Sequence, residues 1–270
     1  MRSLAEFLVF EDVIINYGNV QILKNINLQI KKGTTTMIVG SSGCGKTSLL
    51  NCITGKSVPS SGNVRINGDL VSADKNKLNL RKNMGMLFQK SGLFPDMTVA
   101  ENVALPFYEH YPEMTKTQID IAVKLKLNSV GLRGVYHKYP SELSGGMERR
   151  VALARAVALD PSLILYDEPL TGQDPISCGV LISLMSALRD AYGATSVIVT
   201  HQITTLAKHV DMICILGDKK ILAYDTVDNV FASKEPYIKQ FLAGDPDGVV
   251  PFHHEALPLA IDLNLGEANA

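Results

Sequence analysis

The chain has 270 residues, a length that fits one large domain, or one domain with a subdomain and a tail. It is 46% hydrophobic and 20% charged, an ordinary composition for a globular protein with a sizeable core. The net charge of −1 gives no electrostatic case for nucleic-acid binding, so we expect no nucleic acid among the partners.

The first elements are strands that lead into a glycine-rich loop. Residues 7–16 and 20–30 predict two strands, joined by a turn at 17–19. A short apolar run at 36–39 predicts a third strand, and residues 48–53 predict the start of a helix. The loop between them reads Gly40-Ser41-Ser42-Gly43-Cys44-Gly45-Lys46-Thr47. Strand, glycine-rich loop and helix N-terminus are the context that a phosphate-binding P-loop needs.

The residue types of this loop suit phosphate and magnesium. The glycines let the backbone curl with its N–H groups around an anion, and the helix N-terminus adds partial positive charge. Lys46 can reach the β- and γ-phosphates of a nucleotide, and the Thr47 hydroxyl can bind Mg²⁺. A chance match in a chain of this length has a frequency on the order of 1%. We therefore predict a nucleotide site on residues 40–48, with Ser48 at its end.

The middle of the chain predicts a helical block. Residues 83–89 predict a buried strand that ends at Gln89. Thr98-Val99-Ala100-Glu101 matches a capping box that opens a helix, and residues 98–160 are expected to be largely helical. Two candidate helices within this block span 115–127 and 151–159. A mainly helical block inserted between the P-loop and the next strand suggests a subdomain.

The remaining elements again alternate between strands and helices. Strands are predicted at 163–169, 196–201, 212–216 and 221–224, with a helix at 181–188. Such alternation favours a parallel α/β sheet, with a small antiparallel region from the N-terminal strands. We therefore expect an α/β fold with a mainly parallel sheet, an N-terminal antiparallel β region and an inserted helical subdomain.

The apolar strand predicted within residues 163–169 ends in two acids, Asp167 and Glu168. Parallel strands deliver their C-terminal residues to the ligand-facing edge of a sheet. Asp167 can help hold Mg²⁺ there, and Glu168 can orient or deprotonate an attacking water. Two solvated acids at a strand end are the alternative, and that interpretation would be preferred if the P-loop were absent.

Ser144-Gly145-Gly146 opens a predicted helix and forms a second candidate phosphate site. Ser144 is a helix-capping residue, and the two glycines allow the backbone to approach an anion closely. Because this half-site lies on a different subdomain from the P-loop, we expect a head-to-tail dimer with each nucleotide between subunits. A plain helix cap is the alternative, and it is what an isolated Ser-Gly-Gly usually is.

These motifs, in this order, resemble those of the ATP-binding subunits of ABC transporters over roughly residues 6–240. The motifs that carry the resemblance are the P-loop, Gln89, Leu143-Ser144-Gly145-Gly146-Met147, Tyr166-Asp167-Glu168-Pro169 and His201. The resemblance implies an ABC-type P-loop ATPase that uses ATP and Mg²⁺. It also implies that Lys46, Glu168 and His201 act in hydrolysis.

The resemblance assigns further roles that the residues alone do not. Tyr17, which alone would be interpreted as a turn or core tyrosine, would stack on adenine. Gln89 would contact Mg²⁺ and water and sense a transmembrane partner, and His201 would contact the γ-phosphate. Ser144, Gly145 and Gly146 would bind the γ-phosphate of the opposite subunit's ATP. Asp174 would lie in the loop that crosses the dimer interface.

The chain departs from the general family pattern at two places. Met147 stands where Gln is usual, and Gly172-Gln173-Asp174-Pro175 stands where Ser-Ala-Leu-Asp is usual. Both departures resemble the ATPase subunits of the Mla phospholipid transport systems of Gram-negative envelopes. Residues 241–270 resemble the C-terminal extension of those subunits. Val249, Val250, Phe252 and Leu257 are more apolar than a solvated tail requires, which favours docking on a partner ATPase subunit over a frayed terminus.

The resemblance also implies partners and a location. The partners would be a second copy of the chain, a transmembrane permease, a periplasm-exposed MCE-type lipid-binding subunit and a small STAS-domain protein. The chain has no apolar run of about 18 residues and no secretory signal, so other subunits would hold it at the cytoplasmic face of the inner membrane. Its four cysteines form no CxxC pair, which fits a reducing cytosol.

Two alternatives remain open at this point. The ATPase could serve a transporter of another cargo, such as an amino acid or a lipoprotein. It could instead belong to a soluble ABC-type protein that acts on DNA or ribosomes. Such proteins carry long coiled coils, zinc motifs or a second cassette, and this chain has none of them.

Overall fold

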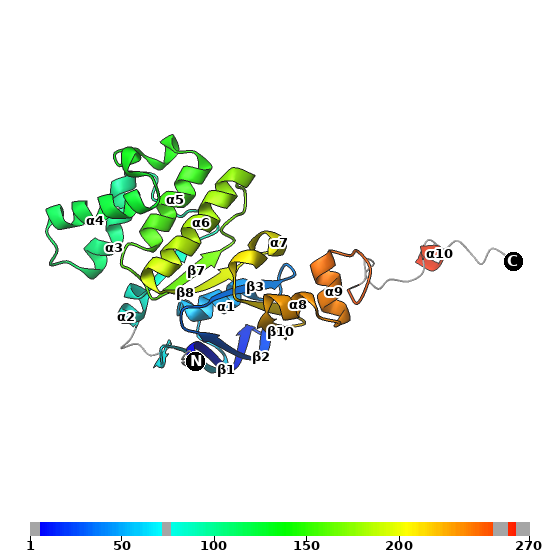
Figure 1. Ribbon diagram of the computed structural model, residues 1–270. Helices are drawn as coiled ribbons and strands as arrows, with labels where there is room; N and C mark the ends of the chain where they lie inside the picture. Colours follow the sequence, from blue (N-terminus) through cyan, green and yellow to red (C-terminus); the bar gives the residue numbers. More distant parts are fainter. Residues whose placement is uncertain (1–5, 72–76, 251–258, 263–270) are drawn as a thin grey trace. The chain divides into compact units, whose positions relative to one another are not determined.

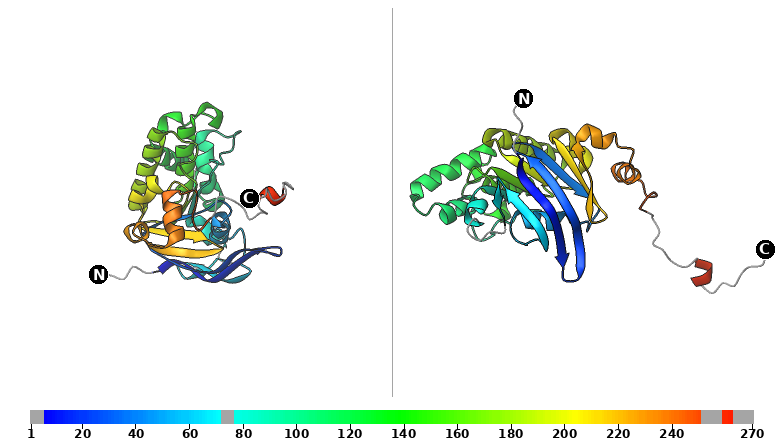
Figure 2. Two further views of the ribbon diagram at one scale, coloured as in Figure 1. Left: turned by 90° about the vertical axis from the view of Figure 1, so that its right-hand side faces the viewer. Right: turned by 90° about the horizontal axis from the view of Figure 1, so that it is seen from below.

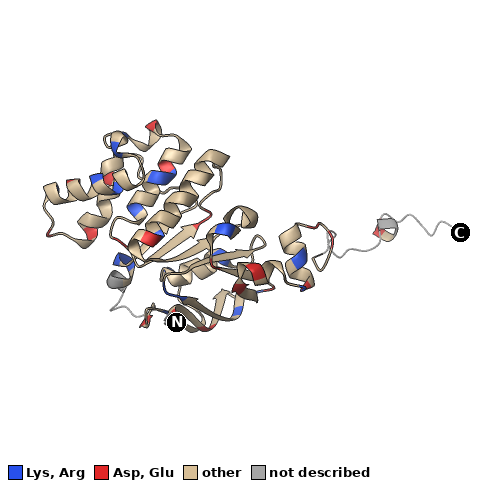
Figure 3. Cartoon of the chain, in the orientation of Figure 1, with Lys and Arg blue, Asp and Glu red and all other residues tan. Residues whose placement is uncertain are grey.

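The computed structural model describes residues 6–71, 77–250 and 259–262. The chain falls into two compact units that divide between Val230 and Phe231. The first unit contains two sheets and a block of helices, which Figure 1 colours along the sequence. Basic and acidic side chains are interspersed along the described elements (Figure 3). Within these ranges, no helix has the length and apolar character needed to cross a membrane.

The N-terminal strands form a small antiparallel sheet in the order β2-β1-β4-β5. Its strands are β1 (Glu6–Tyr17), β2 (Val20–Lys31), β4 (Ser61–Ile66) and β5 (Asp69–Leu70). Burial alternates along the second half of β2, because successive side chains of a strand point to opposite faces. The right-hand view of Figure 2 shows β1 and β2, in blue, crossing the larger sheet. The predicted antiparallel N-terminal region is confirmed.

The larger sheet has the strand order β10-β9-β3-β8-β7-β6. Its strands are β3 (Thr35–Gly40), β6 (Met84–Leu87), β7 (Leu163–Asp167), β8 (Thr195–Val199), β9 (Met212–Gly217) and β10 (Lys220–Thr226). Neighbouring strands are parallel except for β10, which pairs antiparallel with β9. Every residue of β3 and β8 is buried, as expected for central strands covered on both faces. The predicted mainly parallel sheet is confirmed.

Helices cover both faces of the larger sheet. The two that matter most for the site are α1 (Lys46–Ile53) and α6 (Pro175–Tyr192). Leu50 of α1 belongs to one buried cluster with Phe10 of the small sheet and Leu165 of the large one, so α1 lies between the sheets. Ile182 of α6 lies beside Tyr166 on the other face. The P-loop helix is therefore held in the centre of the unit.

Between β6 and β7 the chain forms a helical block. Its helices are α3 (Val99–His110), α4 (Lys116–Ser129) and α5 (Gly145–Ala156), with 3₁₀ turns at Arg133–Val135 and Pro140–Glu142. The predicted capping box is present, since the Thr98 hydroxyl accepts the Glu101 N–H and the Glu101 carboxylate accepts the Thr98 N–H. The predicted helix at 151–159 is only the second half of α5, which begins at Gly145 and ends at Ala156.

Several short helices were not predicted from the sequence. They are α2 (Lys77–Lys82), α7 (Ile203–Leu206), a 3₁₀ turn at Ala207–His209, and α8 (Val227–Phe231). The predicted strand at 196–201 stops at Val199, the one at 163–169 stops at Asp167, and the one at 83–89 spans only 84–87. His201 and Gln89 therefore lie in the loops that follow these strands.

The second unit contains α9 (Pro236–Ala243) and α10 (Leu259–Asp262). The Gln240 side chain holds the segment after α9, because its amide donates to the Val250 carbonyl and accepts the Val250 N–H, each at 2.8 Å. Val249 and Val250 are exposed. Phe252 and Leu257, on which the docking prediction also rests, lie outside the described residues.

Candidate active site

Four parallel strands of the larger sheet end side by side at one edge. They are neighbours in the order β3, β8, β7, β6. β3 ends at Gly40 and β7 ends at Asp167, while His201 and Gln89 follow β8 and β6 by two residues. The carboxyl ends of parallel strands form the ligand-binding edge of such a sheet. The structure therefore brings the predicted P-loop, Asp167, Glu168, His201 and Gln89 to one edge.

Two glycines of the loop occupy positions where a side chain would not fit. A Cβ at Gly40 would lie 2.4 Å from the Leu216 carbonyl oxygen and 2.6 Å from the Cys44 sulfur. Gly45 has a φ of +106°, which L side chains rarely adopt, and its Cβ would lie 2.8 Å from Cδ2 of Leu23. The small N-terminal sheet thus packs directly against the end of the loop.

The loop and the start of α1 present groups that fit phosphate. Gly45 caps α1 without a side-chain hydrogen bond, so no capping side chain occupies the first amide groups of the helix. Nζ of Lys46 donates to the carbonyl oxygens of Gly40 at 2.7 Å and Ser41 at 2.9 Å, which holds the ammonium over the loop. Thr47 is exposed beside it. Amide groups beside a cation suit the phosphates of a nucleotide.

Asp167 is a half-buried acid at the end of β7. Burial raises the pKa of its carboxyl group above the usual value, and the charge of Glu168 acts in the same direction. The nearby cations of Lys56, Lys46 and Arg149 oppose that rise. A carboxylate held close to cations and phosphate-binding amides fits Mg²⁺, which prefers oxygen ligands.

Glu168 is held by its backbone in a position beside His201. Its φ of +47° is unusual for a residue other than glycine, and its N–H donates to the Val199 carbonyl at 2.8 Å. Its Oε2 lies 2.9 Å from Nδ1 of His201. The Glu168 side chain is 14% exposed and that of His201 is 62% exposed. Oε2 of Glu168 is buried and accepts no hydrogen bond from the described residues, so this close approach is an ion pair only when His201 is protonated. The imidazole of His201 itself remains accessible to a ligand.

The other predicted residues belong to elements outside these four strand ends. Tyr17 ends β1 and is half exposed. The Ser144 hydroxyl caps α5 by accepting the Met147 N–H at 3.3 Å, and Gly145 and Gly146 form the first turn of that helix. Asp174 caps α6, and hydrogen bonds from Ser177 lower the pKa of its carboxyl group.

Two cations near the site were not predicted. Lys56 follows α1, and Arg149 is a buried residue of α5. Both act electrostatically on Asp167. The sequence offers no signal for them, because an isolated Lys or Arg near a helix is usually exposed to solvent. Only the packing of α5 beside the strand edge reveals the role of Arg149.

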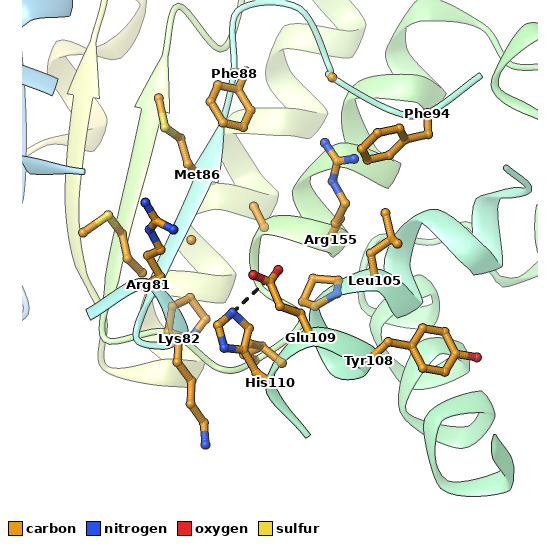
Figure 4. A pocket seen from close by; sticks show the side chains of 17 residues that line it. Arg81, Lys82, Met86, Phe88, Phe94, Leu105, Tyr108, Glu109, His110 and Arg155 are labelled. Carbon is orange, nitrogen blue, oxygen red and sulfur yellow. Dashed lines mark ion pairs between the residues drawn. The ribbon is translucent and has the colours of Figure 1, made fainter. Parts of the chain in front are cut away.

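A hollow of 690 Å³ lies between β6, the loop that follows Gln89, and α3. Figure 4 shows Met86 and Phe88 on one side of it and Leu105 and Tyr108 on the other. Phe94 and Tyr108 are 52% and 53% exposed, which is high for aromatic side chains. The hollow therefore offers a surface of mixed character beside the Gln89 loop, with apolar and aromatic side chains among charged ones (Arg81, Lys82, Glu109 and Arg155).

A loop that wraps phosphate at the carboxyl edge of a parallel sheet defines the class of P-loop nucleotide hydrolases. The model of the ABC transporter family matches residues 23–171. The chain belongs to that family, and it is an ATPase.

Individual relatives and a solved structure agree with this assignment. The intermembrane phospholipid transport system ATP-binding protein MlaF of Escherichia coli K12 is 44% identical over 264 residues, which cover 97% of this chain and 98% of that protein. MlaF of Haemophilus influenzae is 46% identical over 243 residues, which cover 88% and 91%. The ATP-binding cassette MJ0796, solved as a dimer with ADP and Pi, is 30% identical with a TM-score of 0.74, covering 82% of this chain and 98% of that one.

Proposed function

We propose that the chain is the ATP-hydrolysing subunit of an ABC transporter complex that moves phospholipids between the inner and outer membranes and so maintains outer-membrane lipid asymmetry. The observation that carries this proposal is the similarity of nearly the whole chain to MlaF of two bacteria, at 44% and 46% identity. The chain would act as a peripheral subunit at the cytoplasmic face of the inner membrane.

Different residues at the strand edge are proposed to bind the phosphates and the Mg²⁺ of MgATP. The amides of residues 40–48 and the ammonium of Lys46 bind the phosphates. Thr47, Gln89 and Asp167 are the residues that would hold Mg²⁺. When bound, Mg²⁺ neutralises the charge that develops on the phosphate oxygens. The raised pKa of Asp167 means that Mg²⁺ and protons compete for this carboxylate more strongly than at an ordinary aspartate.

Hydrolysis is assigned to Glu168 and His201. Glu168 accepts or orients the proton of the attacking water, and its buried Oε2, which accepts no hydrogen bond within the described part of the chain, supplies an acceptor 2.9 Å from Nδ1 of His201. The exposed imidazole of His201 is free on its other side to contact the γ-phosphate. Water activation and phosphate contact thus come from two adjacent strand ends, β7 and β8.

We infer that two copies sandwich ATP head to tail. The helix N-terminus at Ser144, Gly145 and Gly146 supports this, because it lies on the helical block rather than at the strand ends. The similar cassette MJ0796 was solved as a dimer. In such a dimer these residues bind the γ-phosphate of the partner's ATP, Asp174 lies at the interface, and the exposed Tyr17 stacks on adenine.

The hollow beside the Gln89 loop is the proposed docking site of a transmembrane permease. Its exposed aromatic residues and its contact with the loop of Gln89 support this assignment. The further proposed partners are a periplasm-exposed MCE-type lipid-binding subunit and a small STAS-domain protein.

The test is affinity purification of the tagged full-length chain from solubilised native membranes, with mass spectrometry of proteins and lipids. We expect a permease, an MCE-type subunit, a STAS-domain protein and phospholipid to copurify. A permease without those partners would keep the ATPase and discard the phospholipid cargo. No membrane partner at all would contradict the transporter assignment.

A matched pair of variants tests the docking site separately. Tyr108→Asp places a charge at the hollow and should remove the permease from the purified complex while ATP binding persists. Tyr139→Asp is the control, because Tyr139 is 45% exposed but does not line the hollow. Equal loss of the permease in both variants would contradict docking at the hollow.

A further inference from the structure

One buried arginine joins three segments around the active site. Arg149 of α5 is 6% exposed. Its Nη1 donates to the Phe88 carbonyl at 2.5 Å, and its Nη2 donates to the Gln89 carbonyl and, at 3.5 Å, to the Thr171 carbonyl. A single guanidinium therefore connects α5 (the signature helix, which opens with Ser144-Gly145-Gly146), the Gln89 loop and the turn that follows Glu168.

The turn that contains Thr171 begins at Glu168, the carboxylate assigned to water activation. The Thr171 N–H donates to the Glu168 carbonyl at 3.3 Å, which closes the turn after β7. The side chain of Arg149 thus lies one hydrogen-bonded residue away from Glu168. On the other side it holds the backbone of Gln89 itself.

The rest of the Gln89 loop is fastened to the same helical block. Ser91 bonds to Glu148 through its hydroxyl and to Arg155 through its carbonyl. The fully buried Asn102 accepts the Phe94 N–H at 2.8 Å and donates to the Phe94 carbonyl at 3.0 Å. The loop that lines the hollow is therefore attached to α3 and α5 along its length, and Arg149 is its attachment point nearest the strand edge.

The three hydrogen bonds of Arg149 require a planar guanidinium group. A guanidinium presents several donors in one plane, so it can bond carbonyls of separate segments at the same time. A lysine keeps the charge but offers a single ammonium on a flexible stem, and it cannot reproduce all three bonds. None of the hydrogen bonds of Arg149 involves the P-loop.

We propose that Arg149 is a positioning residue for hydrolysis, which holds Gln89 and the turn after Glu168 in register with the signature helix. A movement of α5, whose N-cap is Ser144, then displaces the backbone at Gln89 and the turn after Glu168 at the same time. The side chain acts on turnover and leaves nucleotide binding by residues 40–48 unchanged.

The test compares Arg149→Lys with Arg150→Lys in the full chain, purified together with the membrane partners that accompany it. Arg150 is the next residue of α5, and its guanidinium donates to the Gly146 and Val130 carbonyls within the helical block. We expect Arg149→Lys to lower kcat about tenfold to a hundredfold, the scale of effect known for small misplacements of catalytic groups. Its KM for ATP should stay within about twofold, and Arg150→Lys should keep a near-normal kcat.

Rates are expressed per ATP-binding site, counted by nucleotide titration, and each variant is assayed below its melting transition. A wild-type kcat for Arg149→Lys would overturn the proposal, and so would a parallel loss of kcat and ATP affinity. If Arg149→Lys fails to fold, Arg149→Gln is measured in the same way. Failure of both to fold would also overturn it, because the side chain would then serve the fold rather than turnover.

Discussion

Glu168 shows how the backbone and side chain of one residue serve the same end. Its φ of +47° places it in a region that costs a residue other than glycine on the order of 1–3 kcal/mol. The N–H bond to Val199 and the contact with His201 compensate for part of that cost. The strained turn aims the carboxylate at the strand edge, where a relaxed backbone would continue β7.

The first prediction concerns Glu168→Gln. The amide keeps the shape of the side chain but cannot accept a proton from water, so we expect kcat to fall by about 10²- to 10⁴-fold. ATP binding should persist and the closed dimer should become more stable. Steady-state hydrolysis, nucleotide titration and gel filtration with ATP measure these effects. Glu113→Gln at an exposed position is the control, and a wild-type rate for Glu168→Gln would refute the role of Glu168.

The second prediction concerns Asp167→Asn in the nucleotide-free protein. Because the pKa of Asp167 is raised in the folded state, the folded state binds the proton of this carboxyl group more tightly than the unfolded state does. The free energy of unfolding therefore falls as pH rises from the unfolded-state pKa to the raised folded-state pKa. Asparagine removes this cost. We expect a higher melting temperature than wild type above the raised pKa, no gain below the unfolded pKa, and loss of hydrolysis.

Thermal melts across the acidic to neutral range measure the effect. Asp96→Asn, at an exposed position of the Gln89 loop, is the control and should show no such pH-dependent gain. A lower melting temperature for Asp167→Asn at neutral pH would contradict the argument, because it would mean that the charged carboxylate stabilises the nucleotide-free fold.

At the scale of elements, the C-terminal end of α5 packs tightly on β6. A Cβ at Gly85 of β6 would lie 2.2 Å from the Ala156 carbonyl oxygen. This contact, together with the Arg149 bonds, fixes α5 against the strand that leads to Gln89. Glycine at this position of the strand is required by the approach of a helix end rather than by a turn.

The third prediction compares two glycine substitutions. Gly85→Ala should destabilise the protein by about 1–3 kcal/mol, because an overpacked backbone contact must open. Gly179→Ala should stabilise it by about 0.5–1 kcal/mol, since Gly179 lies inside α6 with nothing within 4 Å of its Cβ position. Denaturant unfolding of both variants measures the difference. Equal effects would show that the contact with Ala156 is not decisive.

Local sequence patterns predicted the longer strands better than the longer helices. The alternation of β2 and the apolar runs of β3 and β8 are visible in the chain, and the capping box at Thr98 marks the start of α3. The helix predicted at 181–188 is only the middle of α6, and the one at 151–159 covers only the second half of α5. The four- to six-residue helices α2, α7 and α8 escaped prediction because they are too short to show a helical period. The antiparallel direction of β10 depends on its pairing with β9, which no local pattern encodes.

At the scale of the molecule, the candidate active site likewise contains residues that local sequence predicts and residues that only tertiary packing reveals. The P-loop and Asp167-Glu168 were predictable because their chemistry lies in contiguous residues at a strand end. His201 had a role only through the resemblance, and its contact with Glu168 now supplies the physical reason. Arg149 and the hollow were not predictable, because each depends on how the helical block packs against residues some 60 positions away in the chain.

The fourth prediction follows from the separation of the two phosphate sites. Lys46→Ala disables the P-loop, and Ser144→Arg blocks the second helix N-terminus, so either variant alone should lack turnover. In a mixed dimer, one composite site combines the intact P-loop of one chain with the intact helix of the other. Equal mixing gives half mixed dimers with one of two sites intact, so about a quarter of wild-type turnover is expected.

The ATPase rate of the mixture is measured after the two variants are unfolded and refolded together, or after they are coexpressed with different tags. Each variant alone under the same treatment is the control. No recovery in a mixture that demonstrably contains mixed dimers would contradict a site shared between chains. Activity of either variant alone would show that one chain carries a complete site.

The helical block leaves the sheet after β6 and returns at β7, its immediate neighbour. An insertion of this kind can lengthen, shorten or change its surface over evolutionary time while the two strands on either side stay paired. The side chains of α3 that line the hollow can therefore diverge with a membrane partner, while Ser144, Gly145 and Gly146 of the same block are constrained by their proposed contact with phosphate.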